Sequence, residues 1–189
     1  MIRLLSILLI LCTPAFSQEF DGICHLSSNG AQWSGVAISR TEILTVAHPE
    51  PTENIWASFP RKTHGSSERI SLKSRVIRAN KIADLAIISY NCPDNWVVKT
   101  YELSDEKPDV VAIRGYVRDD AMITQGISVV PINATGDGFS LITLNTPAVH
   151  GLSGSGIFSG EKIVGIQSCG MERTYAADIK TIRRFLKGE

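Results

Sequence analysis

Short apolar runs, separated by polar or glycine-containing turns, make up most of this 189-residue chain. Runs of this kind that end at Gly, Asn, Asp or Ser are typical of β-strands. The pattern predicts a first set of strands at Gln32–Ile38, Glu42–Ala47, Ile55–Phe59, Ile70–Ile77 and Leu85–Ser89. It predicts a second set at Val110–Val117, Ile127–Val130, Phe139–Leu144, Gly156–Phe158, Ile163–Ser168 and Thr174–Ala177. The polar stretch Asn91–Lys107 contains Pro93, and it is the expected connection between the two sets.

One segment, at the C-terminus, has the period of a helix. Ile179, Ile182 and Leu186 are spaced i, i+3 and i+7, and Asp178 before them is a suitable start, so a helix is expected at about residues 178–187. Many short strands followed by one helix predict an all-β fold. The periodicity alone does not distinguish a barrel from a sandwich.

The N-terminus has the features of a secretory signal peptide. A positive charge precedes the apolar run Leu4–Leu11, which is too short to span a membrane, and Ala15–Ser17 offers small residues for cleavage. We expect cleavage of residues 1–17 and export of residues 18–189 to the periplasm or the outside of the cell. A chain of that length suits one compact domain or two small lobes that share an interface.

Charge and ligand spacing exclude several classes of function. Lys and Arg together number 19, as do Asp and Glu, so the chain has no strong field to attract nucleic acid or an anionic membrane. No Cys-x-x-Cys or His-x-x-x-His spacing indicates a zinc site. We therefore expect no metal, no nucleic-acid partner and no stable membrane insertion. We also expect no organic cofactor and a monomer.

Three segments carry candidate catalytic residues. The segment Gly151–Gly156 sets Ser153 between glycines, which allows a tight turn with an exposed hydroxyl and backbone amides aimed at one point. His48 ends an apolar run, and Asp84 interrupts another. A buried carboxylate needs strong partners, and a histidine is one of them. The order His, Asp, Ser along the chain is one of the few orders that nucleophile–base–carboxylate triads use.

Four segments resemble motifs of the trypsin-like, chymotrypsin-fold serine proteases of the PA clan, in the order that this family has them. They are Leu44–His48 (histidine motif), Ala83–Ile88 (aspartate segment), Gly151–Gly156 (serine motif) and Lys162–Ser168 (the strand that follows). The resemblance covers nearly the whole chain after the leader. It implies two antiparallel, six-stranded-type β-barrels, at about 20–90 and 108–177, with the active site between them and the helix at the end.

The resemblance also assigns roles to individual residues. Ser153 is the expected nucleophile, His48 the general base and Asp84 the residue that orients the imidazole. The amides of Gly151 and Ser153 form the expected oxyanion hole. Ser168 is expected to hydrogen-bond Asp84, as the serine at that position does in the family. His25 and His64 lie in polar stretches and are expected to be solvated.

The chain departs from the animal members of that family. Leu152 stands where zymogen-activated proteases carry aspartate, so the chain is more similar to bacterial and viral members. Pro147, six residues before Ser153, stands where proteases that cut after Arg or Lys carry aspartate, so cleavage after basic residues is not expected. Candidate residues for a neutral substrate pocket are Pro147, Ala148, Gln167 and Tyr175. Candidates for the alternative, a pocket that prefers Glu or Gln, are Thr146, His150 and Gln167.

Three cysteines remain after the leader: Cys24, Cys92 and Cys169. In an exported protein, an odd number leaves at least one thiol unpaired. We expect a disulfide between Cys24 and Cys92, which ties the N-terminal segment to the connection between the strand sets. Cys169 is expected either as a buried small residue or as a thiol that lines the substrate groove.

These observations predict a secreted or periplasmic serine endopeptidase that hydrolyses polypeptides through an acyl-enzyme and needs no cofactor. Two alternatives use the same residues differently. The first is a catalytically silent protein of the protease fold that binds a partner. The second is an esterase that uses the same triad on non-peptide acyl groups.

Overall fold

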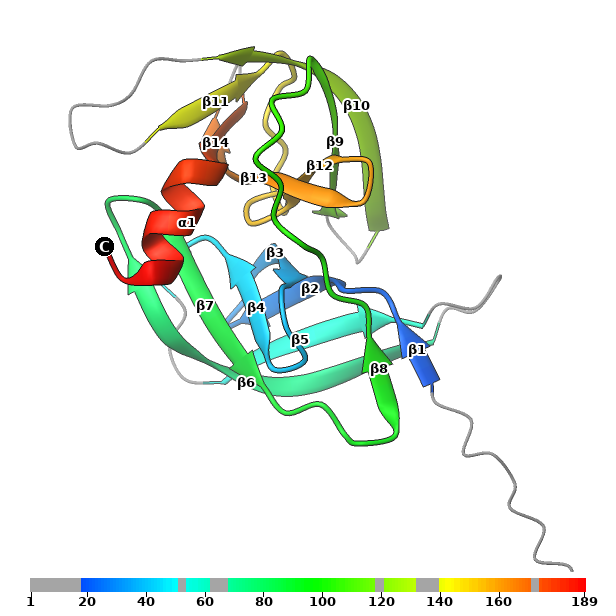
Figure 1. Ribbon diagram of the computed structural model, residues 1–189. Coiled ribbons are helices and arrows are strands. Elements are labelled where there is room, and N and C mark those ends of the chain that lie inside the picture. The colour runs from blue at the N-terminus through cyan, green and yellow to red at the C-terminus, as the bar shows by residue number, and fades with distance from the viewer. Residues whose placement is uncertain (1–17, 51–53, 62–67, 118–120, 132–139, 171–173) are drawn as a thin grey trace, which may run out of the picture.

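The computed structural model describes residues 18–50, 54–61, 68–117, 140–168 and 174–189, and the backbone of 121–131 and 169–170. Within these ranges the chain is mostly β-strand, with one C-terminal helix, as the pattern of apolar runs predicted (Figure 1). The predicted signal peptide, His64 and the side chain of Cys169 lie outside the described residues.

Six strands form a closed barrel in the N-terminal half of the chain. They are β2 (Ile23–Ser28), β3 (Ala31–Ala37), β4 (Glu42–Thr45), β5 (Ile55–Pro60), β6 (Arg69–Asn80) and β7 (Leu85–Tyr90). Their order is β2-β3-β4-β7-β6-β5, all neighbours are antiparallel, and β5 pairs back with β2. The apolar pattern did not predict β2, because five of its six residues are buried and it does not alternate.

Six further strands form a second sheet. They are β9 (Val110–Val117), β10 (Ala121–Pro131), β11 (Leu141–Leu144), β12 (Gly156–Ser159), β13 (Lys162–Gly170) and β14 (Thr174–Asp178). Their order is β10-β11-β14-β13-β12-β9, and β9 pairs back with β10 so that the order closes. Figure 1 shows this sheet above the first barrel.

The connection between the two halves contains a strand that the sequence pattern did not predict. Strand β8 (Trp96–Val98) pairs in parallel with β1 (Gln18–Phe20) at the start of the described chain. The hydroxyl of Tyr101 donates to Asp21 Oδ1 at 2.7 Å and holds the two segments together further along. Strand pairing and this hydrogen bond therefore hold the connection against the N-terminal segment.

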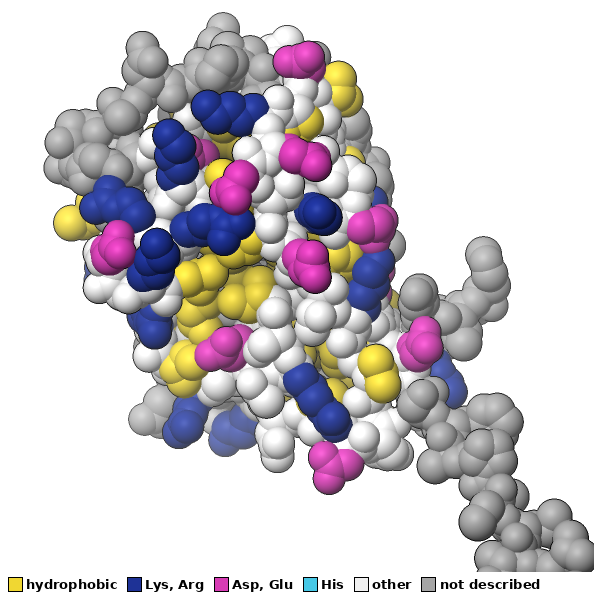
Figure 2. Space-filling model, in the orientation of Figure 1, with side chains coloured by type: hydrophobic (Ala, Val, Ile, Leu, Met, Phe, Trp, Pro, Cys, Tyr) yellow, Lys and Arg dark blue, Asp and Glu magenta, His cyan; other side chains and the backbone are white. Residues whose placement is uncertain are grey.

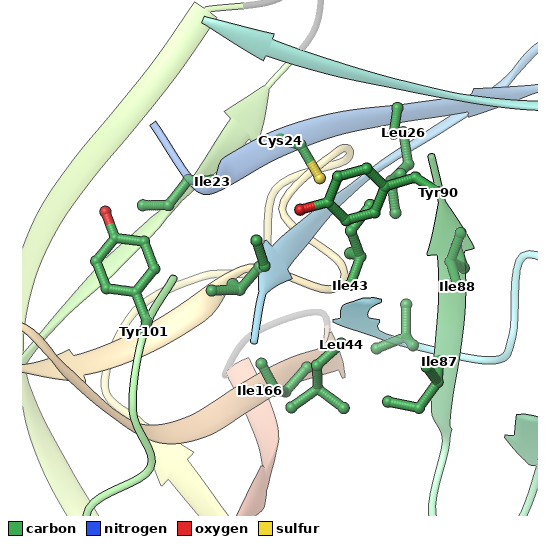
Figure 3. Packing of buried hydrophobic residues seen from close by; sticks show 14 of the residues in the cluster. Ile23, Cys24, Leu26, Ile43, Leu44, Ile87, Ile88, Tyr90, Tyr101 and Ile166 are labelled. Atoms are coloured by element: carbon green, nitrogen blue, oxygen red, sulfur yellow. The ribbon is translucent and has the colours of Figure 1, made fainter. Parts of the chain in front are cut away.

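One apolar core extends from the first barrel into the second half of the chain. Leu44 and Ile87 of the first barrel belong to the same buried cluster as Ile166 of β13 (Figure 3). Ile182 of the helix belongs to it as well. A second, smaller cluster fills the second sheet and includes Ile113 and Leu152. Because apolar burial is the main favourable term in folding, the shared cluster couples the stability of the two halves.

The predicted disulfide between Cys24 and Cys92 is wrong, because both thiols are free. Cys24 Sγ packs between strands, beside the ring of Tyr90 (Figure 3) and against Gly35 of β3. Cys92 Sγ instead donates to the carbonyl oxygen of Trp96 at 3.6 Å. Burial raises the pKa of the Cys24 thiol, so this group remains protonated and packs as a small apolar side chain.

The C-terminal helix α1 (Ile179–Lys187) has defined ends and contacts both halves. Asp178 is its N-cap and accepts from the Thr181 amide at 2.8 Å. Gly188 ends it in the left-handed conformation, with φ of 82°. Arg78 of β6 reaches from the first barrel and donates to the carbonyl oxygens of Phe185 at 3.1 Å and Leu186 at 2.8 Å.

We expect Arg78→Ala to lower the free energy of unfolding by about 1 kcal/mol, because two charge-assisted hydrogen bonds to the negative end of the helix are lost. Chemical denaturation of the variant and of Arg75→Ala, a neighbouring change on the same exposed strand, measures the difference. Equal stability of the two variants would show that the helix does not depend on Arg78.

The surface has no strong local charge on the face drawn in Figure 2. There, basic and acidic side chains are intermixed, which agrees with the balanced charge of the chain. Among the described residues, the nine-residue helix α1 is too short to cross a bilayer, and no helix qualifies as a membrane span.

Candidate active site

Neighbouring strands bring His48 and Asp84 together. His48 follows β4 and Asp84 precedes β7, and these strands pair with Thr45 opposite Ala86. The Asp84 carboxylate spans both the backbone and the ring of the histidine. Its Oδ1 accepts from the amides of Ala47 at 3.0 Å and His48 at 2.8 Å, and its Oδ2 lies 2.8 Å from His48 Nδ1. The contact with Nδ1 leaves Nε2 as the ring nitrogen that can exchange a proton elsewhere.

Asp84 adopts a backbone conformation that few residues tolerate. Its φ is +50°, in the left-handed region, where Asp and Asn are the most frequent residues after glycine. The turn before it is held by Asn80, whose Oδ1 accepts from the amides of Ile82 and Ala83, each at 3.0 Å. The turn and the carboxylate contacts together fix the direction of the Asp84 side chain.

A serine from the second half of the chain completes the surroundings of this carboxylate. Ser168 of β13 donates its hydroxyl to Asp84 Oδ2. Burial raises the pKa of Asp84, but the hydrogen bonds from His48 and Ser168, together with the charge of His48, outweigh burial, and the pKa lies below its usual range. The carboxylate therefore stays ionised at neutral pH.

This lowered pKa predicts a loss of stability in acid. A carboxylate whose pKa is lower in the folded state contributes stability above its unfolded pKa of about 3.9, and this contribution disappears as the pH falls through the folded pKa. We expect the difference in unfolding free energy between the wild type and Asp84→Asn to be constant near neutrality and to shrink below about pH 4. Urea denaturation at a series of pH values measures it. A difference that does not change with pH would contradict the assignment.

The loop between β11 and β12 presents Ser153. Gly151 and Gly154, on either side of it, have φ of 96° and 81°. The amide of Leu152 donates to Val149, that of Gly154 to Gln167, and that of Ser155 to Leu152. Among the described residues, no backbone oxygen accepts from the amides of Gly151 or Ser153. The loop contacts that the structure describes thus leave out the two amides predicted to form the oxyanion hole.

His48 and Ser153 line the same pocket, which has a volume of about 410 Å³. His150, predicted as a pocket residue, lines it as well. The other predicted pocket residues lie outside this lining: Pro147 and Tyr175 are exposed, Ala148 is half-buried, and Gln167 is 1 % exposed. Thr146 is buried, and its carbonyl oxygen accepts from Thr174.

The pocket also contains residues that sequence reasoning missed. Pro49 and the segment 30–33, which runs from the β2–β3 turn into β3, also line it. Neither has a side chain that indicates chemistry. Pro49 directly follows His48, whereas the segment 30–33 is held near the site by the amide of Ser34, which donates to the carbonyl oxygen of Ser153 at 2.7 Å.

The prediction that His25 is solvated is wrong. His25 lies on β2, is 9 % exposed, and packs edge-on against Tyr116 with ring centroids 5.8 Å apart. The error follows from the missed strand, since a polar stretch was taken for a turn.

No family model and no curated protein matches the chain by sequence. Solved structures match its fold closely. Deg5 is 14% identical, with a TM-score of 0.72 over 86% of each chain. A mutant of Rv3671c from M. tuberculosis, in an inactive form, is 14% identical, with a TM-score of 0.69 over 88% of this chain and 85% of that one. Rv3671c protease, also in an inactive form, is 14% identical, with a TM-score of 0.70 over 92% and 90%. The chain therefore shares the chymotrypsin fold of trypsin-like serine proteases.

Proposed function

We propose that this chain is a serine endopeptidase in which Ser153 is the nucleophile, His48 the general base and Asp84 the residue that orients the base. One observation carries the proposal. A histidine whose Nδ1 is held by a carboxylate lines the same pocket as a serine that sits between two glycines of positive φ. The fold shared with Rv3671c protease supports the same conclusion.

The first half of the reaction forms an acyl-enzyme. Ser153 Oγ attacks the carbonyl carbon of the scissile peptide bond, and its proton passes to His48 Nε2. The amides of Gly151 and Ser153 stabilise the tetrahedral oxyanion. The carbon–nitrogen bond then breaks, and His48 Nε2 gives the proton to the departing amine. The acyl group remains as an ester on Ser153.

The second half releases the acid. A water molecule attacks the ester carbon, and His48 Nε2 takes its proton. The carbon–oxygen bond to Ser153 breaks, and the proton returns to Ser153 Oγ. Throughout both halves, Asp84 holds Nδ1–H and stabilises the imidazolium form, while Ser168 keeps the carboxylate in place.

The proposal extends to the setting of the reaction. The active site lies between two β-barrels, and Ser168 and Asp84 come from different ones. Residues 1–17 direct export, the mature chain is 18–189, and its substrates are polypeptides outside the cytoplasm. Pro147, and not an acidic residue, lies six positions before Ser153. The residue on the acyl side of the cut is therefore not Arg or Lys; it is small or apolar, or alternatively Glu or Gln.

Covalent labelling with a fluorophosphonate tests the proposal. Such probes react with an activated serine, which displaces fluoride from phosphorus. We expect one label per molecule, mapped to Ser153 by peptide mass spectrometry, and no label on His48→Ala. That variant keeps the serine but lacks its base. His25→Ala, which changes a histidine outside the pocket, is the matched control and should remain labelled.

Two other results would assign the site differently. A folded wild type that does not react, with unchanged thermal unfolding, would contradict the proposal and favour a silent binding protein. Labelling together with hydrolysis of ester substrates, but not of the matching peptide amides, would instead assign an esterase.

A further inference from the structure

We infer that Ser34 is a positioning residue for the reactive serine. Its hydroxyl joins the loop at Gly151–Ser153 to β3 of the first barrel and to β9 of the second sheet. The inference rests on the proposed function, because it assigns Ser34 a role in the turnover of Ser153. Ser34 lies on β3 of the first barrel, outside the three segments that carry the candidate catalytic residues, and it has no chemistry of its own in the reaction.

The Ser34 side chain bridges two segments of the second sheet. Its Oγ donates to the carbonyl oxygen of Gly151 at 2.9 Å and accepts from the amide of Tyr116 on β9 at 2.7 Å. The residue is 0% exposed, so water does not compete for these partners. One hydroxyl thus uses its single proton and a lone pair to join the nucleophile loop to β9.

The Ser34 backbone adds two contacts to the same site. Its amide donates to the carbonyl oxygen of Ser153 at 2.7 Å. Its carbonyl oxygen accepts from Thr45 Oγ1 at 2.6 Å, and Thr45 ends the strand that leads to His48. The four hydrogen bonds of Ser34 therefore link the loop of the nucleophile to the strand of the base.

The packing around Ser34 leaves little freedom for these contacts to shift. A Cβ placed on Gly154 would lie 2.0 Å from the Ser34 carbonyl oxygen and 2.4 Å from Thr45 Oγ1. A Cβ placed on Gly115 would lie 2.8 Å from Ser34 Oγ. Glycine at both positions allows this approach, so the two halves meet backbone to backbone at Ser34.

The bond to Gly151 acts directly on the predicted oxyanion hole. The carbonyl of Gly151 belongs to the peptide between the two amides that would bind the oxyanion. Removing the hydroxyl takes away the hydrogen bonds that tie this carbonyl and the Tyr116 amide to β3, so the loop is held less firmly. Oxyanion donors act by being fixed before the reaction, so a small rotation of the loop weakens transition-state binding more than substrate binding.

Three variants test the inference. Ser34→Ala removes the bridge, Ser34→Thr keeps a hydroxyl, and Ser74→Ala is the control. Ser74 is also buried in the first barrel, but its hydroxyl donates within β6, to Leu72. We expect Ser34→Ala to lower kcat about 100-fold with KM nearly unchanged, as for a misplaced catalytic group. Ser34→Thr should recover much of this loss, and Ser74→Ala should retain wild-type kcat.

The exchange rate of the Tyr116 amide hydrogen tests the hydrogen bond to Ser34 Oγ independently of activity. We expect slow exchange of this amide in the wild type and faster exchange in Ser34→Ala. The Ser74→Ala variant shows how much of the increase comes from a general loss of stability. Unchanged kcat in Ser34→Ala, or a loss of kcat that follows thermal stability equally in the Ser34→Ala and Ser74→Ala variants, would overturn the positioning role. A wild type that does not label with fluorophosphonate contradicts the proposed function instead, and an unchanged Tyr116 exchange rate in Ser34→Ala then overturns the bridge as well.

Discussion

Replacing Ser153 with alanine is expected to lower kcat for peptide hydrolysis about a million-fold. The change removes the atom that forms the acyl-enzyme and leaves the loop intact. In the described part of the chain, this loop is held by backbone groups and by the hydroxyls of Ser34 and Thr174, and no hydrogen bond there uses Ser153 Oγ. Thermal unfolding should therefore hardly change. Hydrolysis of a fluorogenic peptide by highly purified protein measures the effect.

Ser159→Ala is the matched control for this experiment, since Ser159 ends β12 and its hydroxyl contacts Glu106 on the surface. It should hydrolyse the peptide at the wild-type rate. If Ser153→Ala retained more than about one per cent of the activity, another group would have to be the nucleophile, because the loss expected for a nucleophile is far larger.

Replacing Asp84 with asparagine is expected to lower kcat about 10,000-fold without loss of the fold. Asparagine tolerates the φ of +50°, and its Oδ1 can still accept from the amides of Ala47 and His48. The Nδ2 group, however, is a donor where Asp84 Oδ2 accepts from His48 Nδ1. The imidazole must then carry its proton on Nε2, where it cannot take a proton from Ser153.

The rate at saturating peptide, followed from neutral to alkaline pH, checks this prediction, with Asp94→Asn as the control. Asp94 is fully exposed and pairs with Arg40 on the surface, so its variant should behave as wild type. Near-normal turnover by a folded Asp84→Asn protein would remove Asp84 from the triad.

Much of the fold could be predicted from the sequence, because apolar periodicity reports which strand faces are buried. Ten strands and the helix begin and end within a few residues of their predicted limits, apart from the longer β10. The pattern failed where burial does not alternate. Strand β2 is buried on both faces, and the parallel pair β1 and β8 is too short to show a period. These segments form strands through their tertiary partners.

The sequence likewise predicted one part of the candidate site and missed another. The contact between His48 and Asp84 follows from motifs at the ends of strands, so local sequence was sufficient to anticipate it. The wall of the pocket formed by residues 30–33, and the contacts of Ser34, depend on backbone groups that meet across the two halves. No side-chain pattern encodes such a meeting. The disulfide predicted between Cys24 and Cys92 failed for a similar reason. Their separation along the chain does not tell whether the two side chains point toward each other, and both thiols are free.

The contact of Ser168 with Asp84 has a consequence for the order in which the chain acquires its chemistry. The carboxylate comes from the first barrel and its serine partner from one of the last strands, while Arg78 holds the final helix. During synthesis, a chain that has emerged only as far as β12 holds both His48 and Ser153 but lacks β13, the strand that carries Ser168. The surroundings of the Asp84 carboxylate are therefore complete only after β13 has docked against the first barrel.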